Sequence, residues 1–152
     1  METKWSEAYL SGVRNRWVMV DYYEKRIRQL EEQMLAYGGA SFNSERVQSS
    51  PKGDALEKRV IRFIENEEKL IARFYDQLEA ANEKQDEAME RIGCLKEGNR
   101  KSFLIEYYVN RLSIRDITAL FVHSDEASTR NLKAKALEYF ERVANENGWK
   151  KD

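Results

Sequence analysis

Residues 99–143, NRKSFLIEYYVNRLSIRDITALFVHSDEASTRNLKAKALEYFERV, decide the fold expected of this chain. Short apolar-periodic runs alternate there with polar turns, which predicts three short helices separated by two tight turns. The last run is rich in Arg, Lys, Asn, Ser and Thr. This pattern is typical of a helix-turn-helix, whose second helix usually lies in the DNA major groove.

Capping signals set the expected bounds of the first two helices in this stretch. The first begins at residue 101 or 102 and ends near 110, with Phe103, Leu104 and either Tyr107 or Tyr108 facing inward. A turn at 111–112 follows. Ser113 then N-caps the next helix, with Asp116 at the third helical position in a variant of the capping box. The inward positions of this helix are Ile114, Ile117, Leu120 and Phe121.

The last helix of the stretch follows a turn at Val122 and His123, and either Ser124 or Asp125 caps it. Its core-facing side is expected to hold Leu132, Ala136, Leu137 and Phe140, with Thr129 at the edge. The outward side carries Glu126, Ser128, Arg130, Asn131, Lys133 and Lys135.

Before this stretch, heptad spacing predicts a first long helix over 7–37. Arg16 is the one residue that breaks its apolar seam, and the consecutive glycines Gly38 and Gly39 are expected to end it, since glycine suits a helix C-terminus. The seam comprises Val13, Val20, Tyr23, Ile27, Leu30, Met34 and Tyr37.

A second long helix is expected from Pro51 or Asp54 to Ile92. Nearly forty residues extend for roughly 55–60 Å, and such a rod needs a partner for its apolar stripe. We expect the first helix to fold back on it in antiparallel orientation. The hairpin or oligomer seam is expected to include Val20, Ile27, Leu30, Met34, Phe63, Leu70, Phe74 and Leu78.

The expected fold is therefore all-α: a long, coiled-coil-like antiparallel hairpin over 1–95, followed by a small helix-turn-helix domain over 96–152. The hairpin would serve oligomerisation or docking of a partner. Apolar surface left over on the second helix favours a homo-oligomer, with a dimer preferred. Gly93, Cys94 and Gly98 mark the expected hinge between the two domains.

Composition excludes several classes of protein. The 152 residues include one proline and are 35% charged, which favours long helices. A single cysteine and no apolar run of about 20 residues predict a cytoplasmic protein without a membrane segment. No phosphate-binding glycine loop, catalytic-triad spacing or metal motif is present, so we expect neither an enzyme nor a cofactor.

The stretch that decides the fold resembles the fourth conserved region of bacterial sigma factors. The resemblance rests on Tyr108, Ser113, Ile117 and Thr118, and on the Lys135-Ala136-Leu137 step. The order of segments, including 46–51 between two charged helices, is similar to that of ArpU-type, sigma-like phage proteins over about 15–143. The resemblance implies a transcriptional regulator of a phage or prophage late operon in a bacterial host cell. Host RNA polymerase is then a candidate partner, through the acidic second helix.

Two residues depart from this family's pattern. Val122 stands where the turn usually carries glycine, and Thr118 replaces the alanine that lets the two helices pack closely. The family's capping serine aligns with Ser124 by the turn and with Asp125 by the Ala136-Leu137 step, so the register of the last helix is open by one residue.

If the resemblance holds, a helix over 125–141 contacts double-stranded DNA in the major groove. Arginine suits guanine and asparagine suits adenine, while acidic side chains accept from cytosine. Candidate base contacts are Glu126, Ser128, Arg130 and Asn131; candidate phosphate contacts are Arg115, Ser124, Lys133 and Lys135. From residue 96 to 135 there are eight Lys or Arg against five Asp or Glu, a thin excess that favours a dimer on two half-sites.

Two other functions fit the same pattern. A small terminase-like DNA-packaging subunit also combines a helix-turn-helix with an oligomerising region, although in the reverse order. A coiled-coil adaptor would use the long helices alone, and it should tolerate charge reversal at Arg130 and Asn131, whereas a regulator should not.

Overall fold

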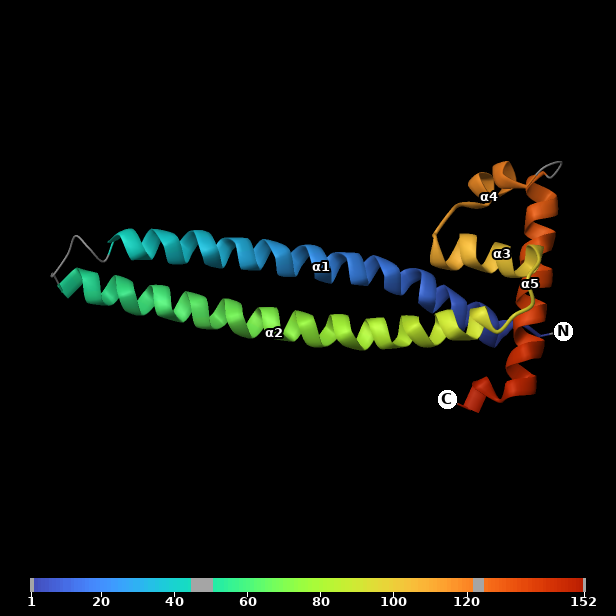
Figure 1. Cartoon of the computed structure of the whole chain (residues 1–152), viewed down its shortest axis with the longest axis horizontal. Helices are drawn as coiled ribbons and strands as arrows, with labels where there is room; N and C mark the ends of the chain where they lie inside the picture. Colours follow the sequence, from blue (N-terminus) through green and yellow to red (C-terminus); the bar gives the residue numbers. More distant parts are fainter. Residues whose placement is uncertain (1, 45–50, 122–124, 152) are drawn as a thin grey trace. The chain divides into compact units, whose positions relative to one another are not determined.

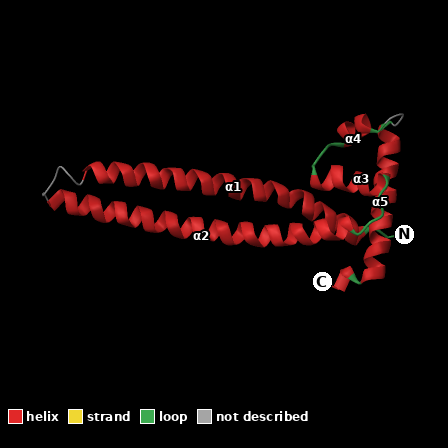
Figure 2. Ribbon diagram, in the orientation of Figure 1, coloured by secondary structure: helices red, strands yellow, loops and turns green. Residues whose placement is uncertain are grey.

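The computed structural model describes residues 2–44, 51–121 and 125–151, and every secondary-structure element within them is helical (Figures 1 and 2). The predicted all-α class is thereby confirmed. A π-helical turn, Ile105–Val109, continues α3, and a short 3₁₀ turn, Trp149–Lys151, follows α5. The helices are α1 (Lys4–Ser44), α2 (Pro51–Gly93), α3 (Asn99–Leu104), α4 (Ile114–Leu120) and α5 (Glu126–Asn147).

The chain divides into two compact units. The terminal unit combines Met1–Val18 with Glu83–Asp152, and the middle unit is Met19–Asn82. This division does not coincide with the boundary expected between residues 95 and 96. The reason is that the first turns of α1 and the last turns of α2 bury their side chains in the same core as α3, α4 and α5.

The core of the terminal unit collects apolar side chains from all five helices. Leu10 of α1 and Ile92 of α2 are almost fully buried in it. Burial of each such side chain contributes about 1.5–3 kcal/mol, so these two residues hold their helices against the rest of the unit. Their partners are Leu95, Phe103, Leu104, Tyr108, Ile117, Ala136, Leu137 and Phe140.

Stacked aromatic rings extend this core at the start of α1. Trp5 stacks on Tyr9 and Phe140, with ring centroids 5.0 Å and 6.0 Å away. Trp149, after α5, lies 5.5 Å from Phe140. The buried guanidinium of Arg91 lies over the rings of Tyr9 and Trp149, at 5.2 Å and 5.3 Å, where the ring faces attract a cation. The two tryptophans, both half-buried, therefore pack against the core of the unit.

A buried carboxylate secures the first turn of α1. Glu141 of α5 is 1% exposed, and its Oε1 accepts a 3.4 Å hydrogen bond from the backbone N–H of Ser6. That N–H belongs to a helix N-terminus, where no carbonyl of the same helix can accept it. Lys150 forms an ion pair with the other oxygen of Glu141. The pair neutralises the buried charge, which would otherwise be costly.

Arg16, which breaks the heptad pattern of the first helix, has a partner on α2. Gln85 is 1% exposed, and its Oε1 accepts a 2.7 Å hydrogen bond from Arg16 Nη1. The Gln85 amide also donates to the carbonyl oxygen of Val13 at 2.9 Å. A buried amide must be paired, so this residue fixes the register of the two helices within the terminal unit.

In the middle unit, α1 and α2 lie side by side (Figure 1). Phe74 contacts the rings of Tyr22 and Tyr23, and the Tyr75 hydroxyl donates to Glu31 Oε1 at 2.8 Å. Of the residues expected in the seam, Val20, Ile27 and Leu30 are buried, whereas Met34, Phe63, Leu70, Phe74 and Leu78 are half-buried.

Several expected helix bounds are wrong. Helix α1 starts at Lys4 rather than at 7, and it continues through Gly38 and Gly39 to Ser44. A glycine inside a helix costs only about 1 kcal/mol relative to alanine, so a pair does not by itself end one. Helix α3 begins at Asn99, two or three residues before the expected start at 101 or 102. Of the two starts considered for α2, Pro51 is the one observed.

Burial corrects two further expectations. Leu120 is 58% exposed rather than inward, because α4 is only two turns long and the residue lies at its end. Thr129 is buried rather than at the edge of the core. Within the described ranges, no helix combines the length and the apolar composition that a membrane crossing needs.

Replacement of Tyr108 by phenylalanine should stabilise the chain. The Tyr108 hydroxyl is buried and has no hydrogen-bond partner among the described residues, and burial raises the pKa of this phenol well above its usual value. An unpaired buried polar group costs about 1–3 kcal/mol. We therefore expect Tyr108→Phe to raise the free energy of unfolding by about 1 kcal/mol in chemical denaturation.

Tyr139→Phe is the matched control for this change. The Tyr139 hydroxyl accepts a 3.0 Å hydrogen bond from the backbone N–H of Lys96, so its loss should destabilise the chain. A larger destabilisation by Tyr108→Phe than by Tyr139→Phe would show that the Tyr108 hydroxyl has a partner.

Candidate nucleic-acid interface

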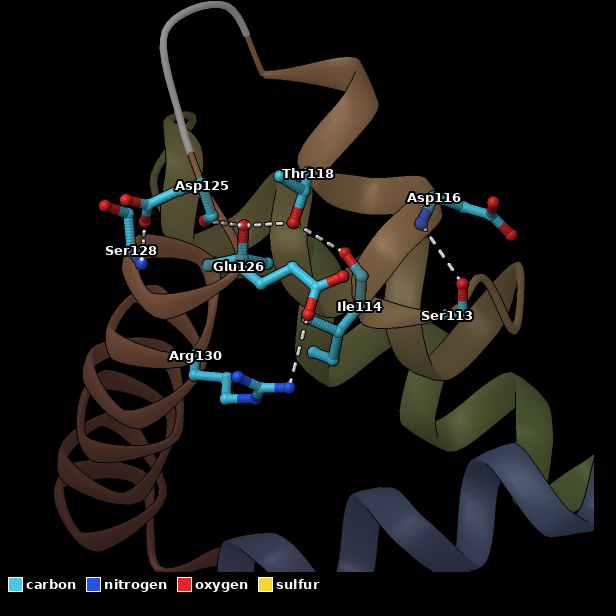
Figure 3. Close-up of polar contacts among 9 residues, drawn as sticks. Ser113, Ile114, Asp116, Thr118, Asp125, Glu126, Ser128 and Arg130 are labelled. Atoms are coloured by element: carbon cyan, nitrogen blue, oxygen red, sulfur yellow. Dashed lines mark hydrogen bonds and ion pairs between the residues drawn. The ribbon is translucent and has the colours of Figure 1, made fainter.

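A turn and a cap position α4. Arg111 has φ of 60°, the left-handed conformation that reverses the chain before the helix. Ser113 then accepts a hydrogen bond from the backbone N–H of Asp116 at 3.1 Å (Figure 3). The prediction that Ser113 caps this helix, three residues before Asp116, is thereby confirmed.

Asp125, one of the two residues considered for the cap, is the N-cap of α5. Its Oδ1 accepts a 2.7 Å hydrogen bond from the backbone N–H of Ser128 (Figure 3). This bond stabilises the charged form and lowers the pKa of the Asp125 carboxyl below its usual value. The expectations for Val122, His123 and Ser124 lie outside the described residues.

Two threonine hydroxyls join α4 to α5. The Oγ1 atoms of Thr118 and Thr129 lie 2.7 Å apart, and each also contacts a carbonyl oxygen of its own helix, that of Ile114 at 2.7 Å and that of Asp125 at 3.0 Å (Figure 3). Buried Thr129 is thus the polar partner of Thr118 across the two helices.

The first turns of α5 present a polar surface. Glu126, Ser128, Arg130, Asn131 and Lys135 are all exposed. Arg130 and Glu126 form an ion pair at 3.4 Å, with 65% and 51% of their side chains exposed (Figure 3). Such an exposed pair is worth less than about 1 kcal/mol, so a ligand can separate the two groups at little cost.

The other two predicted phosphate contacts among the described residues, Arg115 and Lys133, differ in exposure. Arg115 is exposed on α4. Lys133 is half-buried rather than outward, because its Nζ lies 4.7 Å from the centre of the Tyr107 ring. This geometry directs the ammonium of Lys133 toward the π-helical turn.

Sequence reasoning did not identify Arg14 as a neighbour of this surface. Its guanidinium lies 4.2 Å from the centre of the Tyr107 ring, and its Nη2 donates to the Arg111 carbonyl at 3.4 Å. Tyr107 is therefore in contact with two cations, Arg14 and Lys133. No local pattern indicates this contact, since Arg14 and Tyr107 are far apart in the sequence.

Nothing in the described part of the chain assembles a metal site: no group of three His, Cys, Asp or Glu side chains lies within reach of one ion. Cys94 is exposed and forms no disulfide.

A double-mutant cycle on the two threonines tests the junction of α4 and α5. Thr118→Val and Thr129→Val each preserve shape and remove one hydroxyl. We expect a coupling free energy of about 0.5–1 kcal/mol between them in chemical denaturation. Strictly additive losses would contradict a hydrogen bond between the two helices.

Asp125→Asn tests the cap of α5, because asparagine also caps helices but does not titrate. The folded-state pKa of Asp125 is lowered, so its stabilisation is complete above the unfolded pKa, about 3.9, and is lost as the pH falls through the folded pKa. The stability advantage of the natural chain over Asp125→Asn should shrink between about pH 5 and pH 2. An advantage that stays constant over this range would contradict the bond.

Comparisons of the chain with models of protein families, with curated proteins and with solved structures found no match.

Proposed function

We propose that the chain is a sequence-specific DNA-binding transcriptional regulator that contacts the major groove with α5. The observation that carries the proposal is the exposed row of hydrogen-bonding side chains on the first turns of α5: Glu126, Ser128, Arg130, Asn131 and Lys135. A row of this kind, at the beginning of a helix held by its other face, is what recognition helices present to base edges.

The proposed helix-turn-helix consists of α4 and α5. Only a short connection separates Leu120 from Glu126, and the Thr118–Thr129 hydroxyl contact joins the two helices. Helix α3 packs against the buried face of α5, in the core that includes Phe103 and Ala136. This packing supports the proposal because it leaves the opposite face of α5 uncovered in the terminal unit.

Side-chain chemistry assigns different roles along α5. Arg130 pairs with guanine and Asn131 with adenine through two hydrogen bonds each. Lys135 and exposed Arg115 contact phosphates. Among Arg115, Lys133 and Lys135, Lys133 is the least suited to contact a phosphate, because its ammonium already lies over the Tyr107 ring.

The long helices complete the proposal. We propose that α1 and α2 form an antiparallel, coiled-coil-like hairpin that pairs two copies of the chain, since the thin local charge excess favours two half-sites over one. Between residues 54 and 91 there are eleven Asp or Glu against seven Lys or Arg. The contact of this acidic segment with host RNA polymerase stays a prediction.

Selection of duplexes from a random library by the full chain tests the function. We expect recovery of a defined sequence, and Arg130→Ala should weaken binding to it by about 1–3 kcal/mol and relax preference at one base pair. Lys135→Ala should weaken all duplexes similarly and reduce the slope of log K against log salt by about 1. Lys84→Ala, an exposed lysine of α2 in the same unit, is the charge-matched control.

Two outcomes would contradict the proposal. One is recovery of no sequence above the starting library at any salt concentration. The other is an equal loss of binding in Arg130→Ala and Lys84→Ala, which would show that binding depends on net charge and not on a contact between Arg130 and a base.

A further inference from the structure

A pocket of about 500 Å³ opens between α5 and the segment that leads into α3. The segment 96–100 forms one side of it, and Leu132, Lys135 and Tyr139 of α5 form the other. Figure 1 shows the connection from α2 to α3 running alongside α5. The whole pocket lies within the terminal unit, and the roles proposed above for Arg130 and Asn131 do not involve it.

Three cations line this pocket: Lys96, Arg100 and Lys135. None of them forms an ion pair with a described residue. The single carboxylate of the lining, Glu97, is engaged by Lys101, whose Nζ lies 2.6 Å from its Oε1. The pocket therefore has a net positive charge that the described residues leave uncompensated.

Tyr139 adds an oriented hydroxyl to these charges. Its oxygen accepts a 3.0 Å hydrogen bond from the backbone N–H of Lys96, so the hydroxyl keeps its own hydrogen to donate. The guanidinium of Arg100 lies 5.8 Å from the centre of the same ring. The Tyr139 hydroxyl is thus held against the backbone of Lys96, with the Arg100 guanidinium near the same ring, and Leu132 is the apolar residue of the lining.

We propose that this pocket binds the phosphate group of an organic phosphate of nucleotide size. Arginine and lysine bind phosphate through charge-assisted hydrogen bonds, and three of them line this pocket together with the Tyr139 hydroxyl. A single phosphate would fill only part of a volume of about 500 Å³. The remaining space, beside Leu132 and the Tyr139 ring, accommodates the organic part of the ligand.

Such a phosphate can come from a free nucleotide or from the backbone of bound DNA. Both sources present the same group to the same cations. The two sources can be distinguished by whether a mononucleotide and a DNA duplex bind the chain at the same time.

Titration of the full chain with AMP, followed by amide NMR signals, tests the pocket. AMP should shift the amide signals of Lys96, Gly98 and Asn99 in a saturable manner, and adenosine, which lacks the phosphate, should not. Arg100→Ala and Lys135→Ala should each weaken AMP binding about tenfold or more, equivalent to ~1.4 kcal/mol, whereas Lys84→Ala should change it less than about twofold.

Two results would overturn the proposal: no saturable shift in these amides up to about 10 mM AMP, or equal weakening in all three variants. A thermal melt of each variant, matched to the natural chain, shows that lost binding is not lost folding. If a duplex displaces AMP, the pocket binds a phosphate of the DNA backbone. If AMP and the duplex bind at the same time, the pocket binds the phosphate of a free nucleotide. AMP can bind the pocket even if duplex selection recovers no sequence, so failure of the DNA-binding proposal can be distinguished from failure of the phosphate-binding proposal.

Discussion

The terminal unit depends on one core in which residues from the first turns of α1 pack with residues of α5, and a buried carboxylate lies at the edge of that contact. Glu141, near the end of α5, accepts from the backbone of Ser6 in the first turn of α1 and pairs with Lys150. The carboxylate can remain buried only because both partners are present. Around it, Trp5, Tyr9 and Trp149 pack on Phe140 and close the apolar core. The first turn of the chain is thus part of the same core as α5.

This constraint determines how α5 is presented. A segment beginning at residue 96 would lack Leu10 and Ile92, two almost fully buried members of the core. The rear face of α5 therefore packs against α3 and α4 in a core that also includes side chains from both long helices. A helix held on one face by so many contacts keeps the other face in a fixed orientation, which a site that distinguishes base pairs requires.

Local signals predicted most of the helices but not the contacts between distant segments. The cap at Ser113 and the core positions Ile117 and Phe140 follow from spacing, and the same signals limited the cap of α5 to Ser124 or Asp125, because a cap and a helical face depend on neighbouring residues. The contact of Arg14 with Tyr107 and the burial of Glu141 depend on segments far apart in sequence, and no period indicates them. The run of α1 through Gly38 was mispredicted because a local propensity of about 1 kcal/mol was given too much weight.

The central claim is that the exposed face of α5 contacts base edges, and a crystal structure of the chain bound to a selected duplex tests it most directly. We expect α5 in the major groove, with the Arg130 guanidinium and the Asn131 amide about 3 Å from base atoms. A complex in which α5 lies outside the groove, or in which these two side chains face solvent, would contradict it.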